Sequence, residues 1–313
     1  MRAITPRPNL LIVGAPKSGT TSLLMWLRRH YEVYHPWLRA GDEAVESGFL
    51  IAGPSEIPIS PLRPKGTLLL PHETDVDRYR GEPWIIDKSP QHLYSRRALD
   101  TVRDLMPEAR VIITLRDPFD LLISLYTQMW KTVDYQTSLE QLFDMMQSQN
   151  WIADPEAPET WSFLTYPRYS QFVRDWVSQL DPGRVRVITL ASVAGNPQGV
   201  LRKLSGWLGI NEEGMPRNPS VKNSRGKLSN APIRKFLRNP PTWAFSTARL
   251  LMPSRAVRRR ILDPIRRAGW KHIPAEKPKI SSDMENTIRE RLREDTEFFQ
   301  NLSSELPDGM IVD

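Results

Sequence analysis

Short apolar runs recur along the first two thirds of the chain, and each is followed by residues with the spacing of an amphipathic helix. The runs have the length of buried strands, and they end at glycine, proline or polar residues. The predicted strands cover residues 10–13, 84–86, 110–115 and 185–190. The predicted helices cover residues 20–30, 95–105, 119–130, 139–147, 166–180, 198–208 and 282–302. Because strands that alternate with helices are joined by right-handed crossovers, the pattern predicts an α/β, three-layer fold with a central parallel sheet flanked by helices.

Two long stretches lack this alternation. Residues 32–81 are rich in proline and glycine, so we expect an excursion across the mouth of the sheet that holds substrate contacts. The last third of the chain is predicted to be helical, with interruptions at four prolines between positions 240 and 264. We predict a single domain over residues 1–313, in which residues 228–313 form a basic and mostly helical C-terminal part.

Composition excludes several kinds of chemistry. The chain has no cysteine, so disulfides, thiol catalysis and cysteine–metal sites are ruled out. Its five histidines do not form a cluster with the spacing of metal ligands, and no metal is expected. We find no apolar run of about 18 residues and no signal-peptide pattern, which predicts a cytoplasmic protein.

Positive charge is concentrated in one region. The net charge is +7, yet residues 231–272 alone carry eleven Lys or Arg against a single acidic residue. Such a mixture of basic and apolar residues can touch an anionic membrane surface through residues 232–271, although a proline-kinked helical cap with a wet basic face is the favoured interpretation. No nucleic-acid motif or aromatic platform accompanies the arginines, so no nucleic-acid partner is predicted. Nothing in the sequence indicates an oligomeric state.

The first predicted strand ends in a loop with the features of a phosphate cradle. Gly14 and Gly19 relieve a tight turn, and the hydroxyl residues at 20–22 begin a helix whose N-terminus attracts anions. The spacing of the two glycines matches a Walker A loop, but Thr20 stands where that loop has its lysine, and Lys17 lies inside the loop. An ordinary ATP or GTP site is therefore disfavoured. A P-loop kinase is the weaker enzyme alternative, since no convincing acidic partner for Mg²⁺ is found.

Two further motifs follow predicted strands. Arg116 ends one strand and Ser124 lies eight residues on, in the next helix, where the two side chains can bind one phosphate together. Lys88 belongs to the run Asp-Lys-Ser-Pro at 87–90, directly after the strand at 84–86. A basic, glycine-bearing loop occupies residues 222–227.

In order and spacing these motifs resemble those of sulfotransferases that use 3′-phosphoadenosine 5′-phosphosulfate (PAPS), with a style similar to carbohydrate-type and bacterial members. The run PKSGTTSL at 16–23 resembles the family's 5′-phosphosulfate loop. The frame around Arg116 and Ser124 resembles its 3′-phosphate motif, although Leu121 stands where a second arginine is often found. Residues 87–90 resemble its E/D-K-S-P segment, and residues 222–227 resemble a late segment that closes over the 3′-phosphate.

The resemblance implies a P-loop-containing fold and a function. Such an enzyme moves a sulfuryl group from PAPS to a hydroxyl or amine of a carbohydrate, lipid or small natural product, releases adenosine 3′,5′-bisphosphate, and needs no metal. Lys17 and Lys88 would stabilise the moving group and the departing phosphate. The implied cofactor-binding residues lie within residues 10–227, and they are Pro16, Lys17, Ser18, Gly19, Thr20, Thr21, Ser22, Arg116, Ser124, Lys222, Arg225, Gly226 and Lys227.

The general base is less clearly marked. Carbohydrate-type members usually place a glutamate in a K-E-P-x-F-F-like segment after the first helix, where counting on from Val33 gives Arg39 and Ala40 in this chain. Acidic residues follow a little later, at Asp42, Glu43 and Glu46, and a shifted loop would make Glu43 the base. His92, close after the Asp-Lys-Ser-Pro run, and His35 are the alternatives. The missing glutamate also leaves open a non-catalytic module that binds PAPS or another nucleotide.

Overall fold

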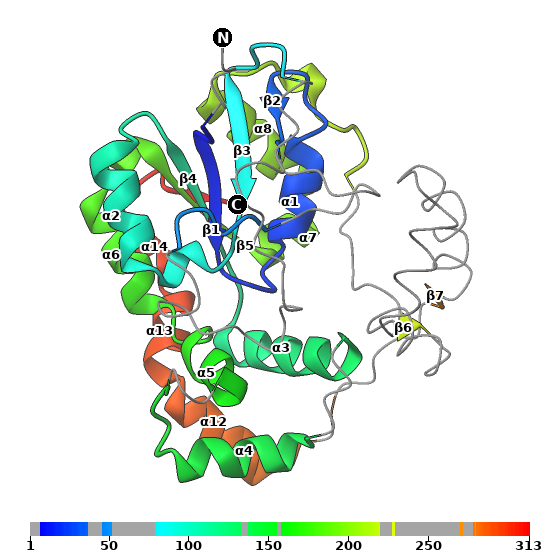
Figure 1. The fold of residues 1–313 in the computed structure, drawn as a ribbon, viewed down its shortest axis with the longest axis vertical. Coiled ribbons are helices and arrows are strands. Elements are labelled where there is room, and N and C mark those ends of the chain that lie inside the picture. The colour runs from blue at the N-terminus through cyan, green and yellow to red at the C-terminus, as the bar shows by residue number, and fades with distance from the viewer. Residues whose placement is uncertain are drawn as a thin grey trace, which may run out of the picture. The chain divides into compact units, whose positions relative to one another are not determined.

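The computed structural model describes residues 7–36, 46–51, 79–132, 137–154, 158–219, 227–228, 270–271, 278 and 280–313 (Figure 1). The chain divides into two compact units. The first comprises Met1–Leu38, Ala44–Val221 and Lys277–Asp313, and the second comprises Arg39–Glu43 and Lys222–Glu276. The motifs at 14–22, 87–90 and 116–124 all belong to the first unit.

A six-stranded parallel sheet forms the centre of the first unit, which confirms the predicted fold class. The strand order is β2-β3-β1-β4-β5-β8, so that β1 lies between β3 and β4 (Figure 1). The strands are β1 (Leu10–Gly14), β2 (Val33–Tyr34), β3 (Trp84–Lys88), β4 (Arg110–Leu115), β5 (Val185–Thr189) and β8 (Ile311–Val312). The two edge strands, β2 and β8, were not predicted, because two residues are too few to show a periodic pattern.

Helices cover both faces of this sheet. They are α1 (Thr20–Leu27), α2 (Arg96–Leu105), α3 (Pro118–Thr132), α4 (Leu139–Ser148), α5 (Pro158–Thr165), α6 (Ser170–Gln179), α7 (Leu190–Gly195), α8 (Pro197–Leu208), α12 (Ser282–Arg291), α13 (Arg293–Gln300) and α14 (Leu302–Glu305). Short 3₁₀ turns, η3 (His92–Tyr94), η4 (Pro182–Arg184) and η5 (Glu212–Gly214), complete the first unit.

Helix boundaries differ from the prediction where tertiary contacts decide them. The helix expected over 166–180 begins only at Ser170, whose backbone N–H donates to Asp295 Oδ1 of α13 at 2.8 Å. Helix α5 covers residues for which no helix was predicted, and the helix expected over 282–302 is broken at Leu292 and Asn301.

The core consists of two layers, one on each face of the sheet. In β1, Leu11 and Val13 face a large cluster that also contains residues of α2, α3, α6 and α13. Leu10 and Ile12 face the opposite cluster, which contains residues of α1 and α8. Since both faces of a parallel sheet are covered, its central strands contain nearly continuous apolar runs, as β1 and β4 show.

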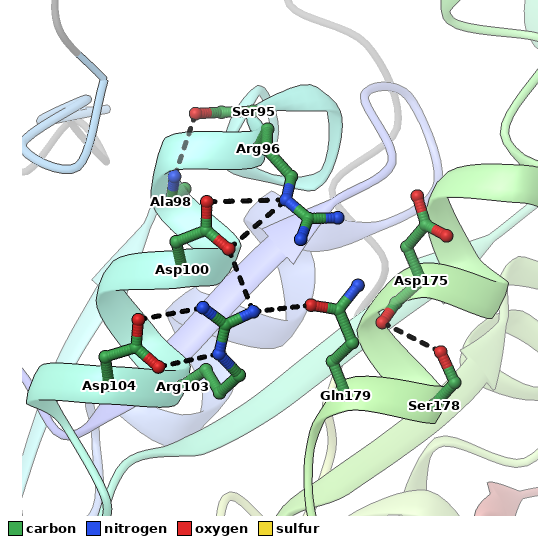
Figure 2. A network of polar contacts seen from close by, with 9 residues as sticks. All are labelled: Ser95, Arg96, Ala98, Asp100, Arg103, Asp104, Asp175, Ser178 and Gln179. Carbon is green, nitrogen blue, oxygen red and sulfur yellow. Dashed lines mark hydrogen bonds and ion pairs between the residues drawn. The ribbon is translucent and has the colours of Figure 1, made fainter.

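A network of polar contacts on the surface connects α2 and α6 (Figure 2). The Arg103 guanidinium contacts Asp100 and Asp104 on its own helix and donates to Gln179 Oε1 of α6 at 2.7 Å. Ser95 caps the start of α2 by accepting the Ala98 N–H at 3.0 Å. Exposed ion pairs of this kind contribute little to stability, so the two core layers hold the fold together.

The second unit contains one described element, an antiparallel pair of β6 (Lys227–Leu228) and β7 (Trp270–Lys271). Of the basic region at 232–271, all but Trp270 and Lys271 lies outside the described residues, and so do most of residues 32–81. Among the helices that the structure describes, none has the length and apolar character needed to cross a bilayer.

Candidate active site

Sheet topology brings three of the predicted motifs to one edge. The loop at 14–22 joins β1 to α1, Lys88 is the last residue of β3, and Arg116 directly follows β4. Because β3 and β4 are the two neighbours of β1, their ends lie on either side of this loop. The register aligns Ile12 with Lys88 and Gly14 with Ile113. Neighbouring strands are about 4.8 Å apart, and ligands of such sheets bind outside the carboxyl ends of the strands.

The start of the loop is fixed to β4. The Ala15 N–H donates to the Thr114 carbonyl at 2.6 Å, and the Thr114 hydroxyl donates to the Gly14 carbonyl at 2.9 Å. Gly14 is required here because a Cβ atom would lie only 2.5 Å from the Leu93 Cβ. The loop therefore leaves the sheet in a defined direction.

The rest of the loop exposes the N-terminus of α1. Lys17 and Gly19 adopt left-handed backbone conformations, with φ of 63° and 91°, and Gly19 occupies the N-cap position without a side chain to cap the helix. The first N–H groups of α1 and the positive end of its dipole are the usual partners of a bound phosphate. Pro16, Ser18, Thr20 and Ser22 are buried, and Lys17, Gly19 and Thr21 are partly buried.

Arg116 and Ser124 belong to the end of β4 and to α3. The Arg116 guanidinium lies 3.4 Å from Asp120 Oδ2, and its backbone carbonyl accepts a hydrogen bond from the Tyr169 hydroxyl at 2.7 Å. Asp120 and Ser124 are four residues apart in α3 and so share one face of the helix. Arg116 thus contacts a residue one turn before Ser124, and the binding of one phosphate by Arg116 and Ser124 stays a prediction.

Lys88 has a partner that the sequence analysis did not select. Its ammonium Nζ lies 2.6 Å from Glu46 Oε1, and the amide of Gln91 donates to Glu46 Oε2 at 3.2 Å. The Lys88 side chain is 3% exposed, whereas that of Glu46 is 33% exposed. A carboxylate is therefore held beside the strand end next to the phosphate loop and still meets solvent.

A sequence signal for Glu46 was present. Residues 46–50 read Glu-Ser-Gly-Phe-Leu, so Glu46 and Phe49 match the glutamate and the first phenylalanine of the E-P-x-F-F part of the family pattern, whereas the proline and the second phenylalanine are replaced. Counting on from Val33 missed it, because this segment comes seven residues after Arg39. The predicted base Glu43 and its neighbour Asp42 lie outside the described residues.

The two histidine candidates are both buried. His35 follows β2, and neither of its ring nitrogens has a hydrogen-bond partner in the described part of the chain. Burial, together with the positive charges of Arg28 and Lys88, lowers the pKa of His35 to about 3. His35 is buried, whereas the Glu46 side chain is 33% exposed and contacts Lys88, and this access favours Glu46 over His35 as the base.

His92 begins η3, four residues after Lys88 at the end of β3. Its Nε2 accepts the Leu50 N–H at 3.4 Å, and its Nδ1 lies 3.7 Å from Asp87 Oδ2. Both side chains of this pair are fully buried. The imidazole is thus engaged with protein groups beneath the site.

Burial raises the pKa of the Asp87 carboxyl to about 6, although hydrogen bonds from Ser47 and Ser89 and the charge of Lys88 oppose the shift. The unfolded chain has the ordinary value of 3.8, so between the two values the folded state binds more protons than the unfolded state. We expect Asp87 to lower the free energy of unfolding by about 3 kcal/mol as pH rises from about 4 to above 6.

Urea denaturation of the wild type and of Asp87→Asn across this pH range isolates the effect. The wild type should lose stability relative to the variant as pH rises. A difference between the two proteins that stays constant with pH contradicts the assignment.

The predicted contacts of residues 222–227 with the donor lie mostly outside the described residues. Lys222, Arg225 and Gly226 lie outside the described residues, and Lys227 is placed in β6, in the second unit. Within the described ranges, no group of three or more His, Asp or Glu side chains is arranged to hold a metal ion.

Comparison with known proteins agrees with this geometry. The model of the sulfotransferase family matches residues 69–214, which include Lys88, Arg116 and Ser124 but not the phosphate loop. The heparan sulfate glucosamine 3-O-sulfotransferases 3B1 and 3A1 of Mus musculus are each 24% identical over 217 residues, or 65% of this chain and 46% of theirs. The chain thus spans about half the length of these curated relatives.

A solved structure shares the fold. The sulfotransferase from Alicyclobacillus acidocaldarius aligns with a TM-score of 0.56 at 23% identity, covering 74% of this chain and 90% of that one. The family match and the curated relatives thus make the chain similar to sulfotransferases, and the solved sulfotransferase shares its fold.

Proposed function

We propose that the protein is a PAPS-dependent sulfotransferase that transfers a sulfuryl group to a hydroxyl or amine of an acceptor. The observation that carries the proposal is the contact between Lys88 and Glu46, 2.6 Å long, at the end of the strand adjacent to the phosphate loop. This pair places the Lys88 ammonium, which can stabilise the transferred sulfuryl group, beside the Glu46 carboxylate, which can take the proton of the acceptor.

The donor is held at both of its phosphorylated ends. The turn from Pro16 to Ser22 and the N-terminus of α1 bind the 5′-phosphosulfate, with Lys17 as the charged partner. Arg116 binds the 3′-phosphate with Ser124, and the phosphate takes the place of Asp120 on the guanidinium. A contribution of residues 222–227 to donor binding stays a prediction from the family resemblance.

In the chemical step, Glu46 takes the proton of the acceptor hydroxyl or amine while that oxygen or nitrogen forms a bond to sulfur. The bond between sulfur and the bridging phosphate oxygen breaks, and the electron pair leaves with adenosine 3′,5′-bisphosphate. Lys17 and Lys88 stabilise the negative charge that grows on the bridging oxygen and on the sulfuryl oxygens. Glu46 then releases its proton to solvent, to which its side chain is open.

The acceptor class is a carbohydrate, a lipid or a small natural product. The curated relatives are named as sulfotransferases of heparan sulfate glucosamine, so a saccharide is the first acceptor to test. A cytoplasmic location and a contact of residues 232–271 with an anionic membrane surface remain predictions.

Two measurements test the function. Isothermal titration should show that adenosine 3′,5′-bisphosphate binds more tightly than ATP, and the reverse preference contradicts the proposal in favour of a kinase. Transfer of labelled sulfate from PAPS is then measured with a heparan sulfate oligosaccharide, 4-nitrophenol and galactosylceramide. Tight binding of adenosine 3′,5′-bisphosphate without transfer to any of them favours a non-catalytic binding module.

A further inference from the structure

Glu46 lies in a segment whose position depends on side chains of another part of the chain. Residues 46–51 form neither helix nor strand, so no sheet hydrogen bonds hold them. Their polar groups are bound instead by Asp87 near the end of β3 and by Ser89 and His92, which follow this strand. Such a segment keeps its place only if its backbone donors find partners.

Three buried acceptors supply these partners. The Ser47 hydroxyl donates to Asp87 Oδ1 at 2.5 Å, and the Gly48 N–H donates to Ser89 Oγ at 2.9 Å. The Leu50 N–H donates to His92 Nε2. Asp87, Ser89 and His92 all have 0% exposure, so water does not compete for these bonds.

The three acceptors are themselves fixed to the central strand. Asp87 pairs in register with Leu11 of β1, and the Ser89 N–H donates to the Ile12 carbonyl at 3.1 Å. The His92 N–H then donates to the Ser89 carbonyl at 2.9 Å. The strand that carries the phosphate loop therefore also fixes the groups that hold residues 46–51.

The His92 ring has one orientation that satisfies its neighbours. Because Nε2 accepts the Leu50 N–H, the ring proton belongs on Nδ1, which faces Asp87 Oδ2 at 3.7 Å. The Phe49 ring also packs edge-on against the imidazole, with centroids 5.5 Å apart. His92 thus contacts the segment through the Leu50 N–H and the Phe49 ring, whereas its Nδ1 lies beyond hydrogen-bond distance of Asp87 Oδ2.

We infer that Asp87, Ser89 and His92 form an anchor that holds residues 46–51 so that Glu46 reaches Lys88 and the acceptor, an inference that rests on the proposed function. The anchor is a set of positioning residues and touches no reacting atom. It explains why consecutive residues of the Asp-Lys-Ser run contact consecutive residues of the Glu-Ser-Gly run.

The test compares variants that remove an acceptor with variants that keep one. Ser89→Ala and His92→Leu should each lower kcat about 10- to 100-fold, because a base displaced by about 1 Å loses rate on this scale. Ser89→Thr and His92→Gln retain an acceptor and should restore most of the rate. The affinity for adenosine 3′,5′-bisphosphate should stay within about threefold in all four, since its binding groups lie on other elements. Rates are measured with whichever of the three test acceptors the wild type sulfates fastest.

A double-mutant cycle separates positioning from general damage. In the background of Glu46→Gln, Ser89→Ala should cause no further loss of rate, because the anchor acts through Glu46. An equal further loss in that background overturns the inference.

Hydrogen exchange gives a readout that does not need transfer. Peptides covering residues 46–51 should exchange faster in Ser89→Ala and His92→Leu than in wild type, with adenosine 3′,5′-bisphosphate bound in each case. Unchanged exchange overturns the anchor. Faster exchange in a protein whose Glu46→Gln variant keeps full activity supports the anchor and contradicts the proposed base.

Discussion

Replacing Glu46 with Gln is expected to lower kcat for sulfuryl transfer about 10²- to 10⁴-fold, the usual contribution of a positioned general base. The amide keeps the size of the side chain and its contact with Gln91, but it cannot take the acceptor's proton. Binding of adenosine 3′,5′-bisphosphate should be unchanged, because Glu46 contacts Lys88 and Gln91 and belongs to neither phosphate site. Initial rates with labelled PAPS and titration with adenosine 3′,5′-bisphosphate measure the two effects.

Substitutions of two other glutamates, Glu43 and Glu297, serve as comparisons for Glu46→Gln. Glu43→Gln tests the rival position expected from the sequence, and it should retain most of the activity. Glu297→Gln, on the exposed surface of α13, is a matched control for the loss of one negative charge. If Glu43→Gln loses the rate while Glu46→Gln keeps it, the base is wrongly assigned.

Replacing Lys17 with Met is expected to lower kcat about 10²- to 10³-fold, the effect of removing one donor to charge that develops in the transition state. Affinity for the donor should fall as well, since the ammonium also meets the 5′-phosphate in the ground state. Thermal stability should change little, because Met keeps the aliphatic stem of a side chain that is only partly buried. The left-handed backbone at Lys17 costs the same for either residue, as both carry an unbranched Cβ.

Lys203→Met is the control for this variant. Lys203 lies on the exposed surface of α8, where it pairs with Asp313, which follows the edge strand β8 and not β1 or its neighbours β3 and β4. The rate and the donor affinity of the control should match those of the wild type. A Lys17→Met protein with wild-type kcat contradicts the role given to the loop.

The four inner strands of the sheet could be predicted because burial on both faces gives each of them an apolar run. The run at 110–115 matches β4, and the run at 10–13 falls one residue short of β1, whose last residue is Gly14. Helices whose ends depend on distant residues were harder to predict, as the start of α6 on Asp295 shows. Strand order also required the structure, since it sets β1 between β3 and β4 and so makes neighbours of Lys88, the loop and Arg116.

The phosphate loop could be predicted from the sequence, whereas the position of Glu46 could not. The phosphate loop is recognisable in the sequence because its glycines and hydroxyl residues must occur at fixed spacing on one turn. Glu46 does not, because it lies on an irregular segment whose place is set by hydrogen bonds to residues about forty positions away. The burial of His92 could not be predicted either, because it follows from the packing of η3 against Gly14. There Leu93 of η3 fills the space that a side chain at position 14 would need.

The attachment of residues 46–51 has a consequence for engineering. Glu46 and the donors that fix its segment lie within residues 46–51, and their partners lie within residues 87–92. These two short stretches can therefore be kept together while the rest of the sequence is changed. A library that keeps these six residues and the turn at 87–92 constant, while varying the sequence on both sides of the segment, retains the chemistry in every member. Selection from such a library would change which acceptor is sulfated without having to rebuild the means of sulfating it.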